Sequence, residues 1–296
     1  MKRRASPPIA VAVLLVAAGA AALPNGVVPS RLPAAVHAHE GGFVWDDYRA
    51  LLRKHVDDSG VVYYRGLKRD SALLRGFAAS LAAVDRREYA KWPYEQKIAF
   101  WINAYNGLTL KVIVDNYPIE PTFPARLYHP KNSIRQIKGV WDEVTFNVMG
   151  TPMTLEDIEH GTLREEFDEP LIHMALVCAA MGCPPLRNEP YVGDRLEEQF
   201  ADQSVKFLAT RSKFRIDRRR DEVHLSPIFK WFGEDFVERY GTSMKFAGHD
   251  KEERAVLNCI SPHLGEADRR YLETADYDIE YLDYDWSLNE RQSPVE

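Results

Sequence analysis

One segment of the chain, residues 93–117, constrains the fold most because it is apolar on nearly every side of a helix. Pro93 stands at a position that suits the first turn of a helix, and Tyr117 precedes a proline, where helices usually end. A helix that is apolar all round must be buried. The Lys, Asn and Asp residues that interrupt the segment argue against a membrane span. We therefore predict a long, buried central helix.

Two asparagines of this segment, Asn103 and Asn106, are three residues apart and so share one helical face. Buried amides must find hydrogen-bond partners. These side chains therefore either tie down a neighbouring loop or line a pocket, and both interpretations stay open. In a pocket, Asn103 is predicted to bind a ligand. Asn106 is predicted to orient a substrate or to stabilise an oxyanion.

Hydrophobic periodicity and turn residues divide the rest of the chain into short helices and strands. Helices are predicted at residues 45–56, 71–84, 155–166, 194–208 and 251–259, with one more beginning near Pro227. Strands are predicted at residues 61–64, 141–148, 171–178 and 277–288, with a hairpin over 214–225. The pattern predicts a single α+β domain over residues 43–290, with helices packed around a small, mostly antiparallel sheet.

The N-terminus has the pattern of an export signal. Basic residues at positions 2–4 precede an apolar run over residues 9–23. This run is shorter than the roughly 20 residues that a spanning helix needs. Small residues offer cleavage sites after Ala22 or after Ala38. Residues 1–38 are therefore predicted to be a signal peptide and pro-like segment. The mature protein is predicted to be periplasmic or secreted, with no stable membrane span.

Charge and motifs exclude several classes of function. The 38 basic and 44 acidic residues give a net charge of −6. Without residues 1–38, which hold four basic and no acidic residues, 34 and 44 remain, and the net charge is −10. Phosphate contacts need a basic surface, so no nucleic-acid partner is predicted. The chain also lacks a glycine-rich phosphate loop, a dinucleotide fingerprint and a G-x-S-x-G elbow. No cofactor is predicted.

The segment ALVCAAMGCPPLRNEPY holds the strongest candidates for chemistry. Cys178 ends the predicted buried strand, and Cys183 lies in the tight loop after it, a common place for reactive groups. Cys178 is predicted to be a nucleophile, but three alternatives stay open. It is an inert core thiol, it forms a disulfide with Cys183, or both cysteines join histidines around zinc. A disulfide would leave Cys259 unpaired. No metal is predicted, because the spacing matches no standard zinc pattern.

A cysteine nucleophile usually needs an imidazole partner. His173 is five residues before Cys178, and side chains five apart in a regular strand point to opposite faces. We therefore predict His160, on the preceding helix, as the base. His173 replaces it if the strand carries a bulge.

Charged groups in the same part of the sequence suggest a binding site. Arg187 and Lys230 are predicted to grip a carboxylate, which fits a non-catalytic module that binds a peptide or a small thiol compound. Asp285 alternates with apolar residues near the C-terminus, and it is either solvated or binds a ligand. This binding module is the main alternative to an enzyme.

Five blocks of the chain, taken together, resemble the DUF547 family, a domain of unknown function. They are KIAFWINAYNGLTL, TLEDIEHGTLR, HMALVCAAMGCPPLRNEPY, SPIFKWFGEDF and YLDYDWSLN, in that order. The resemblance covers about residues 45–290 and implies an exported bacterial module with no accepted reaction or cofactor. The blocks contain Asn103, Asn106, His160, His173, Cys178, Cys183, Arg187, Lys230 and Asp285. We predict a cysteine-dependent hydrolase or acyl transferase, with the binding module as the alternative.

Overall fold

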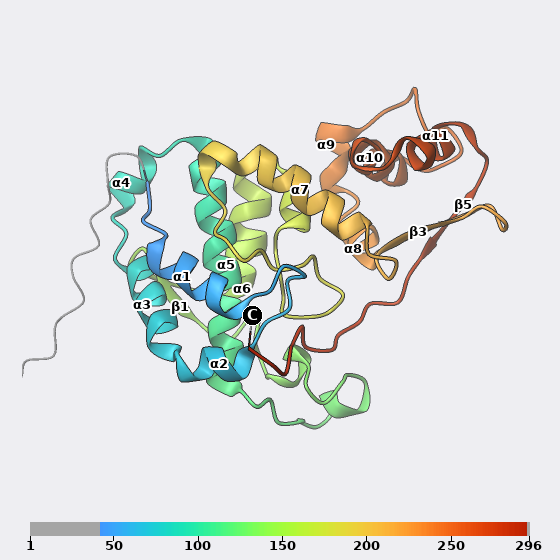
Figure 1. Cartoon of the computed structure of the whole chain (residues 1–296). Coiled ribbons are helices and arrows are strands. Elements are labelled where there is room, and N and C mark those ends of the chain that lie inside the picture. Colours follow the sequence, from blue (N-terminus) through green and yellow to red (C-terminus); the bar gives the residue numbers. More distant parts are fainter. Residues whose placement is uncertain (1–41, 295–296) are drawn as a thin grey trace, which may run out of the picture. The chain divides into compact units, whose positions relative to one another are not determined.

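The predicted central helix dominates the structure, a computed structural model that describes residues 42–294. This helix, α5 (Tyr94–Asn116), begins directly after Pro93 and ends before the extended residue Tyr117. Residues on all of its sides are buried, as the apolar pattern predicts. Figure 1 shows α5 surrounded by other helices. The predicted signal segment, residues 1–38, lies outside the described residues.

The remaining elements are shorter than α5. The other α-helices are α1 (Asp46–His55), α2 (Tyr64–Arg69), α3 (Ser71–Ala82), α4 (Arg86–Ala90), α6 (Leu155–Ile158), α7 (Leu196–Leu208), α8 (Pro227–Trp231), α9 (Asp235–Tyr240), α10 (Lys251–Ile260) and α11 (Glu266–Thr274). The strands are β1 (Phe146–Val148), β2 (Thr151–Met153), β3 (Phe214–Asp217), β4 (Glu222–Leu225) and β5 (Asp278–Tyr281).

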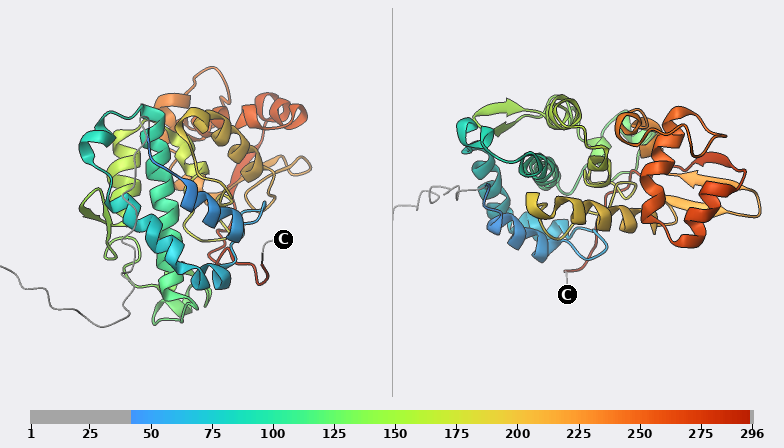
Figure 2. Two further views of the ribbon diagram at one scale, coloured as in Figure 1. Left: turned by 60° about the vertical axis from the view of Figure 1, so that its left-hand side comes forward. Right: turned by 90° about the horizontal axis from the view of Figure 1, so that it is seen from above.

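The larger hydrophobic core forms around α5. The helices α2, α3 and α6 contact it, and α1 packs on α3. Figure 2 shows α5 nearly end-on in its right-hand view, with these helices and α7 around it. Aromatic rings fill the space between α1 and α3, where Tyr48 stacks on Phe77 with ring centroids 4.2 Å apart. The central helix therefore supplies the rigid base on which later segments are positioned.

A second group of buried apolar side chains joins α8–α11 to a three-stranded sheet. In this sheet β4 pairs antiparallel with β3 and parallel with β5. The strands β1 and β2 form a separate antiparallel hairpin. Among the described strands, antiparallel pairs therefore outnumber the parallel one. The prediction of an α+β single domain with a long buried central helix is confirmed.

Most of the predicted helices are confirmed within a few residues, but several predicted strands are wrong. Residues 171–178 do not form a strand. A 3-10 helix, Pro170–Met174, begins there with its first turn capped by the carboxylate of Glu169, and a buried turn follows. A short apolar run suits either element, so periodicity alone could not separate them. Of residues 141–148 only β1 is a strand, and of residues 277–288 only β5 is one.

The predicted strand at residues 61–64 is also wrong. Val62 makes only isolated bridges, to Val56 and to Glu290, and α2 begins at Tyr64. The second bridge joins the start of the described chain to its end.

Substituting Gly107 is expected to destabilise the fold, although alanine favours helices. A Cβ at Gly107, in the middle of α5, would lie 2.2 Å from the ring of Phe77. The helix-propensity gain of about 1 kcal/mol should be outweighed by overpacking, so Gly107→Ala should lose about 1–2 kcal/mol of unfolding free energy. Gly76→Ala is the matched control. Gly76 lies inside α3 with no neighbour within 4 Å, so this variant should gain about 0.5–1 kcal/mol. Urea unfolding measures both, and a gain for Gly107→Ala would contradict the packing described here.

Candidate active site

A cavity of about 370 Å³ brings together three of the residues predicted to be catalytic, His160, His173 and Cys178. Aromatic side chains make up most of its walls, and a few polar groups point to the same space. The cavity is lined by Tyr105, Arg135, Trp141, Glu159, His160, His173, Leu176, Cys178, Cys183, Ile228, Trp231, Phe232, Tyr284 and Trp286. Apolar walls with a few convergent polar groups are typical of small-molecule sites.

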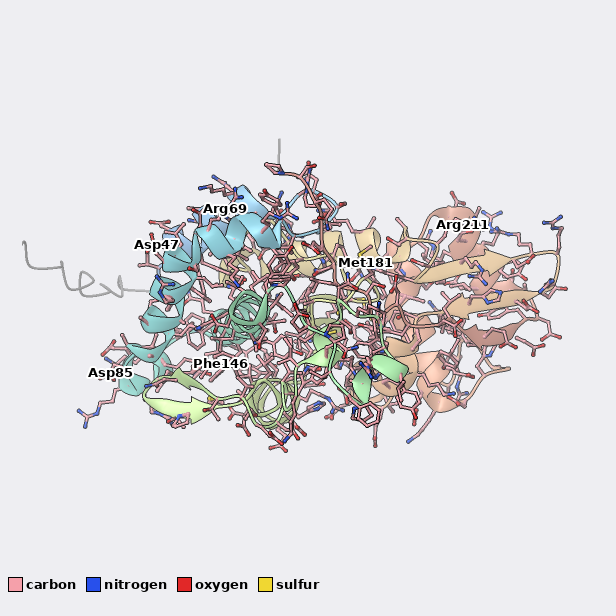
Figure 3. The ribbon with its side chains drawn as sticks, turned by 90° about the horizontal axis from the view of Figure 1, so that it is seen from below. Asp47, Arg69, Asp85, Phe146, Met181 and Arg211 are labelled. Carbon is pink, nitrogen blue, oxygen red and sulfur yellow. The ribbon has the colours of Figure 1, made fainter. Side chains whose placement is uncertain are left out.

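The loop between the two cysteines, residues 179–182, is held by the C-terminal segment, residues 282–291. The amides of Met181 and Gly182 each donate to a carbonyl oxygen of that segment at 2.8 Å. Figure 3 shows Met181 near the centre of the described structure, between the N-terminal helices and the C-terminal sheet. The C-terminal segment then continues to Val62, whose amide donates to it at 2.8 Å. It therefore forms one wall of the cavity and also fastens the cysteine loop.

Tyr284 reaches both sulfur atoms because Gly182 leaves room for its ring. A Cβ at Gly182 would lie 2.8 Å from that ring, closer than packing allows. The Tyr284 hydroxyl lies 3.0 Å from Sγ of Cys183 and 3.4 Å from Sγ of Cys178. Both cysteines are free thiols in the structure, and their Sγ atoms are 2.6 Å apart, so a disulfide between them would need little movement.

The hydrogen bonds around the sulfur pair favour Cys183 as the thiol that ionises first. Its Sγ accepts from the amide of Cys178 at 3.0 Å, besides its contacts with the Cys178 thiol and the Tyr284 hydroxyl. Burial opposes ionisation, but these hydrogen bonds outweigh it and lower the pKa of Cys183 to about 7. The hydrogen bond that Cys178 gives to Cys183, together with burial, raises the pKa of Cys178 well above its ordinary value. One proton therefore stays on Cys178.

His173 faces the same cavity as the cysteines, so the prediction that a regular strand turns it away is wrong. The 3-10 helix that replaces the strand changes the direction of the side chain. The imidazole is buried and stacks on Phe232, with ring centroids 4.1 Å apart. Its Nε2 donates to Oδ2 of Asp235 at 2.7 Å. This bond fixes the ring and leaves Nδ1 as the nitrogen that can take up a proton.

Asp235 also connects the two histidines through Arg164. The guanidinium of Arg164 donates to both carboxylate oxygens of Asp235, at 2.6 and 2.7 Å. A third nitrogen of Arg164 lies 2.7 Å from Nδ1 of His160, and since arginine only donates, that nitrogen accepts. The hydrogen of a neutral His160 is therefore on Nε2. Burial opposes a charge on Asp235, but hydrogen bonds from Arg164 and His173 hold the pKa of Asp235 well below its ordinary value.

Asn103 and Asn106 are buried and tie down loops, and neither lines the cavity. Asn106 donates to the carbonyl oxygen of Ala175 at 3.0 Å and accepts from the amide of Val177 at 2.9 Å. Asn103 makes the same pair of bonds with the backbone of Tyr191, at 2.8 and 2.9 Å. Of the two interpretations left open, the contacts favour the structural one. Asn106 holds the residues that lead into Cys178.

The other predicted ligand-binding residues lie away from the cavity lining. Arg187 is held by two carboxylates, including that of Glu189 at 2.6 Å. Lys230 is exposed, and its Nζ lies 5.2 Å from the centroid of the Tyr281 ring. Asp285 is exposed and accepts from a nearby backbone amide at 2.9 Å. The backbone carbonyl of Asp285 does hold the loop between the cysteines, but none of these three side chains joins the cysteines in the cavity lining.

The residues that sequence reasoning missed are Asp235, Arg164 and Tyr284. Each lies inside one of the five blocks that resemble the family, but nothing in the sequence assigns it a role. Asp235 and Arg164 pair across a long stretch of sequence, which a single chain does not reveal. The alternating pattern near the C-terminus gives Tyr284 no role of its own, and only the fold brings it to the thiols.

The described residues contain no group of three or more His, Cys, Asp or Glu that could hold a metal ion. The zinc interpretation therefore has no support within residues 42–294. In the same range, no helix is long and apolar enough to cross a membrane.

Comparisons with known proteins leave the reaction unassigned. No curated protein matches the chain, and no solved structure matches it. A family model does match residues 89–208, a stretch that contains the first three of the five blocks along with both histidines and both cavity cysteines. It ends before Asp235 and Tyr284. Residues 89–208 therefore match the model of the DUF547 family, which is described as a protein of unknown function.

Proposed function

We propose that the cavity is the active site of a cysteine-dependent hydrolase or acyl transferase that acts on a small molecule or peptide. The observation that carries this proposal is a thiol whose sulfur receives three hydrogen bonds, Cys183, in the same cavity as a histidine held by a carboxylate, His173 with Asp235. A thiolate, an imidazole base and an orienting acid are the groups that thiol-based acyl transfer needs.

Cys183 is the better nucleophile of the pair. Its sulfur accepts hydrogen bonds from the Cys178 amide, the Cys178 thiol and the Tyr284 hydroxyl, and these stabilise a negative charge there. The sequence pattern favoured Cys178, because only the fold brings these donors together around the second sulfur. Cys178 then acts as a positioning residue that keeps its proton and donates a hydrogen bond to the thiolate.

His173 is the better base. Asp235 orients its ring and stabilises the imidazolium that forms when Nδ1 takes up a proton. The Nδ1 lone pair of His160 is instead engaged by Arg164, and its Nε2 carries a hydrogen. His160 is therefore suited to donate to an oxyanion, the role that the sequence suggested for Asn106.

The proposed reaction begins when the Cys183 thiol gives its proton to Nδ1 of His173. The thiolate attacks the carbonyl carbon of the substrate, the bond from that carbon to the leaving group breaks, and the leaving group departs with the proton from Nδ1. A thioester to Cys183 remains. Water then attacks the thioester carbon and gives one proton to Nδ1, the carbon–sulfur bond breaks, and Nδ1 returns the proton to the sulfur of Cys183 as the carboxylic acid leaves. In an acyl transferase, another nucleophile takes the place of water.

Export to the periplasm or the medium is part of the same proposal, and it is supported by the basic residues and the short apolar run of the N-terminus. Intact mass of the protein recovered outside the cytoplasm tests it. Loss of residues 1–22 or 1–38 is the expected result, and an uncleaved cytoplasmic chain would contradict it.

A panel of 4-nitrophenyl esters, aryl thioesters and peptide anilides tests the reaction. Cys183→Ser is expected to lower kcat/KM for any substrate turned over by about a thousandfold or more, because serine is not ionised there. Cys259→Ala is the matched control. Cys259 is buried in α10, outside the cavity lining, and burial raises its pKa to about 12. Turnover that survives Cys183→Ser would exclude the proposed nucleophile.

The alternative, a non-catalytic binding module, is favoured by one observation. Tryptophan and other aromatic rings form most of the cavity wall, which suits binding as well as catalysis. A ligand that binds equally well to the wild type and to Cys183→Ser, with no turnover of any related ester or amide, would support this alternative.

A further inference from the structure

Arg135 stands at the aromatic end of the cavity. It is the one Lys or Arg among the lining residues. Its guanidinium carbon lies 4.9 Å from the centroid of the Trp286 ring and 5.5 Å from that of Trp141. Its Nε donates to Nε2 of His129 at 3.2 Å. A guanidinium held against aromatic faces keeps its plane fixed while its terminal nitrogens stay able to donate.

No carboxylate of residues 42–294 forms an ion pair with Arg135. Arg164 and Arg187 differ in this respect, since each is held by a carboxylate oxygen at 2.6 Å. The two terminal nitrogens of Arg135 also have no hydrogen-bond partner within the described part of the chain. Arg135 is exposed, so solvent reaches these nitrogens, and the described part of the protein leaves both guanidinium donors free for a ligand.

Arg135 is separated from the thiols by two aromatic rings. The Trp286 ring lies next to the guanidinium, the Tyr284 ring lies 4.6 Å from that of Trp286, and the Tyr284 hydroxyl contacts both sulfurs. Glu159 is at the thiol end, where it adds to the effects of Cys183 and burial in raising the pKa of Cys178. The cavity therefore has a positive group at one end and a negative group near its reactive end.

We infer that Arg135 selects the substrate of the proposed reaction, an acyl compound whose terminal carboxylate is separated from the reacting carbonyl by an apolar or aromatic segment. Two parallel N–H groups match the two oxygens of a carboxylate. A phosphate, with up to two negative charges, would need a second basic side chain, and the lining holds none. The inference rests on the proposed function for the reacting carbonyl. The carboxylate site itself does not need a reactive thiol.

Calorimetric titration with two matched probes tests this inference. The probes are 3-phenylpropionate and its neutral amide, 3-phenylpropionamide. The wild type is expected to bind the carboxylate about tenfold or more tightly than the amide, as a charge-assisted bidentate contact provides. In Arg135→Gln the two probes should bind within about twofold of each other. Arg126→Gln is the matched control, since Arg126 is exposed and stacks on Phe123 outside the cavity lining. It should keep the tenfold preference.

Two further measurements keep the outcomes separate. Arg135→Lys keeps the positive charge but loses the two parallel N–H donors. This variant is therefore expected to prefer the carboxylate over the amide by about threefold, and it can be measured even if the Gln variant fails to fold. Cys183→Ser should bind both probes as the wild type does. The binding test is therefore independent of the proposed reaction. Equal affinity for the two probes in the wild type, no binding of either, or a preference that survives Arg135→Gln would overturn the inference.

Discussion

Iodoacetamide is expected to label Cys183 of the reduced, folded protein at a rate that follows a single ionisation centred near pH 7, because the pKa of this thiol is lowered to about 7. At pH 7 about half of Cys183 is then thiolate, against roughly 1% for a thiol with an ordinary pKa near 9, and since a thiolate of lower pKa is a weaker nucleophile, labelling should be faster by about five- to tenfold. Burial raises the pKa of Cys259 to about 12, so this cysteine should stay unlabelled between pH 5 and 9. Peptide mass mapping across that range measures both rates.

Two variants test the cause of the low pKa. Cys178→Ala removes the S–H donor and keeps the backbone amide that also donates to Cys183. Tyr284→Phe removes the hydroxyl. Each variant should move the midpoint of the curve of Cys183 labelling rate against pH upward, toward pH 9, because the thiolate loses one hydrogen bond. A midpoint that neither change moves, or a wild type that reacts only above pH 9, would contradict the assignment of the charge to Cys183.

Asp235→Ala is expected to cause the largest loss of stability among variants at the site, about 3 kcal/mol. The change leaves His173, which is 2% exposed, and Arg164, which is 28% exposed, without their shared acceptor. Breaking a buried ion pair by removing one partner typically costs about 3–5 kcal/mol, and the partial exposure of Arg164 favours the lower end. Urea unfolding at pH 7 measures the loss. Glu234→Ala is the control, since Glu234 is exposed and adjacent, and it should change stability by less than about 0.5 kcal/mol.

The pH dependence of the same variant has a defined sign. The pKa of the Asp235 carboxyl is lower in the folded protein than its ordinary value of 3.8. The contribution of this carboxylate to the free energy of unfolding is therefore complete above about pH 4, and it is lost as the pH falls toward the folded-state pKa. The difference in unfolding free energy between the wild type and Asp235→Ala should be constant between pH 5 and 8 and should narrow below about pH 4. A gap that widens in acid would contradict this assignment.

The central helix could be predicted because its signal is local. Residues 93–117 are apolar all round, and prolines mark both ends, so the burial and the limits of α5 follow from the sequence. The helix after Thr154 is a second example. The Thr154 side chain accepts a hydrogen bond from the amide of Asp157, and the Asp157 carboxylate accepts one from the amide of Thr154, as expected for a capping box. Such signals need no knowledge of distant residues.

The site could be predicted only in part, because its geometry depends on distant contacts. Cys178, His160 and His173 do meet in one cavity, although a 3-10 helix and not a strand directs His173. The pairing of Asp235 with His173 joins residues far apart in the chain. A single sequence without homologues shows no trace of such a pair. The same holds for Tyr284, whose hydroxyl contacts both sulfurs.

The fastening of the cysteine loop by residues 282–291 also determines when this chemistry can begin. A nascent chain that has emerged only as far as residue 208 already holds both cavity cysteines and both cavity histidines. It still lacks the Asp235 carboxylate, the Tyr284 hydroxyl and the carbonyl groups that hold the loop. Before translation reaches the last segment, Cys183 is therefore an ordinary thiol among others. The order of synthesis itself delays the reactive state until the chain has folded around its own C-terminal segment.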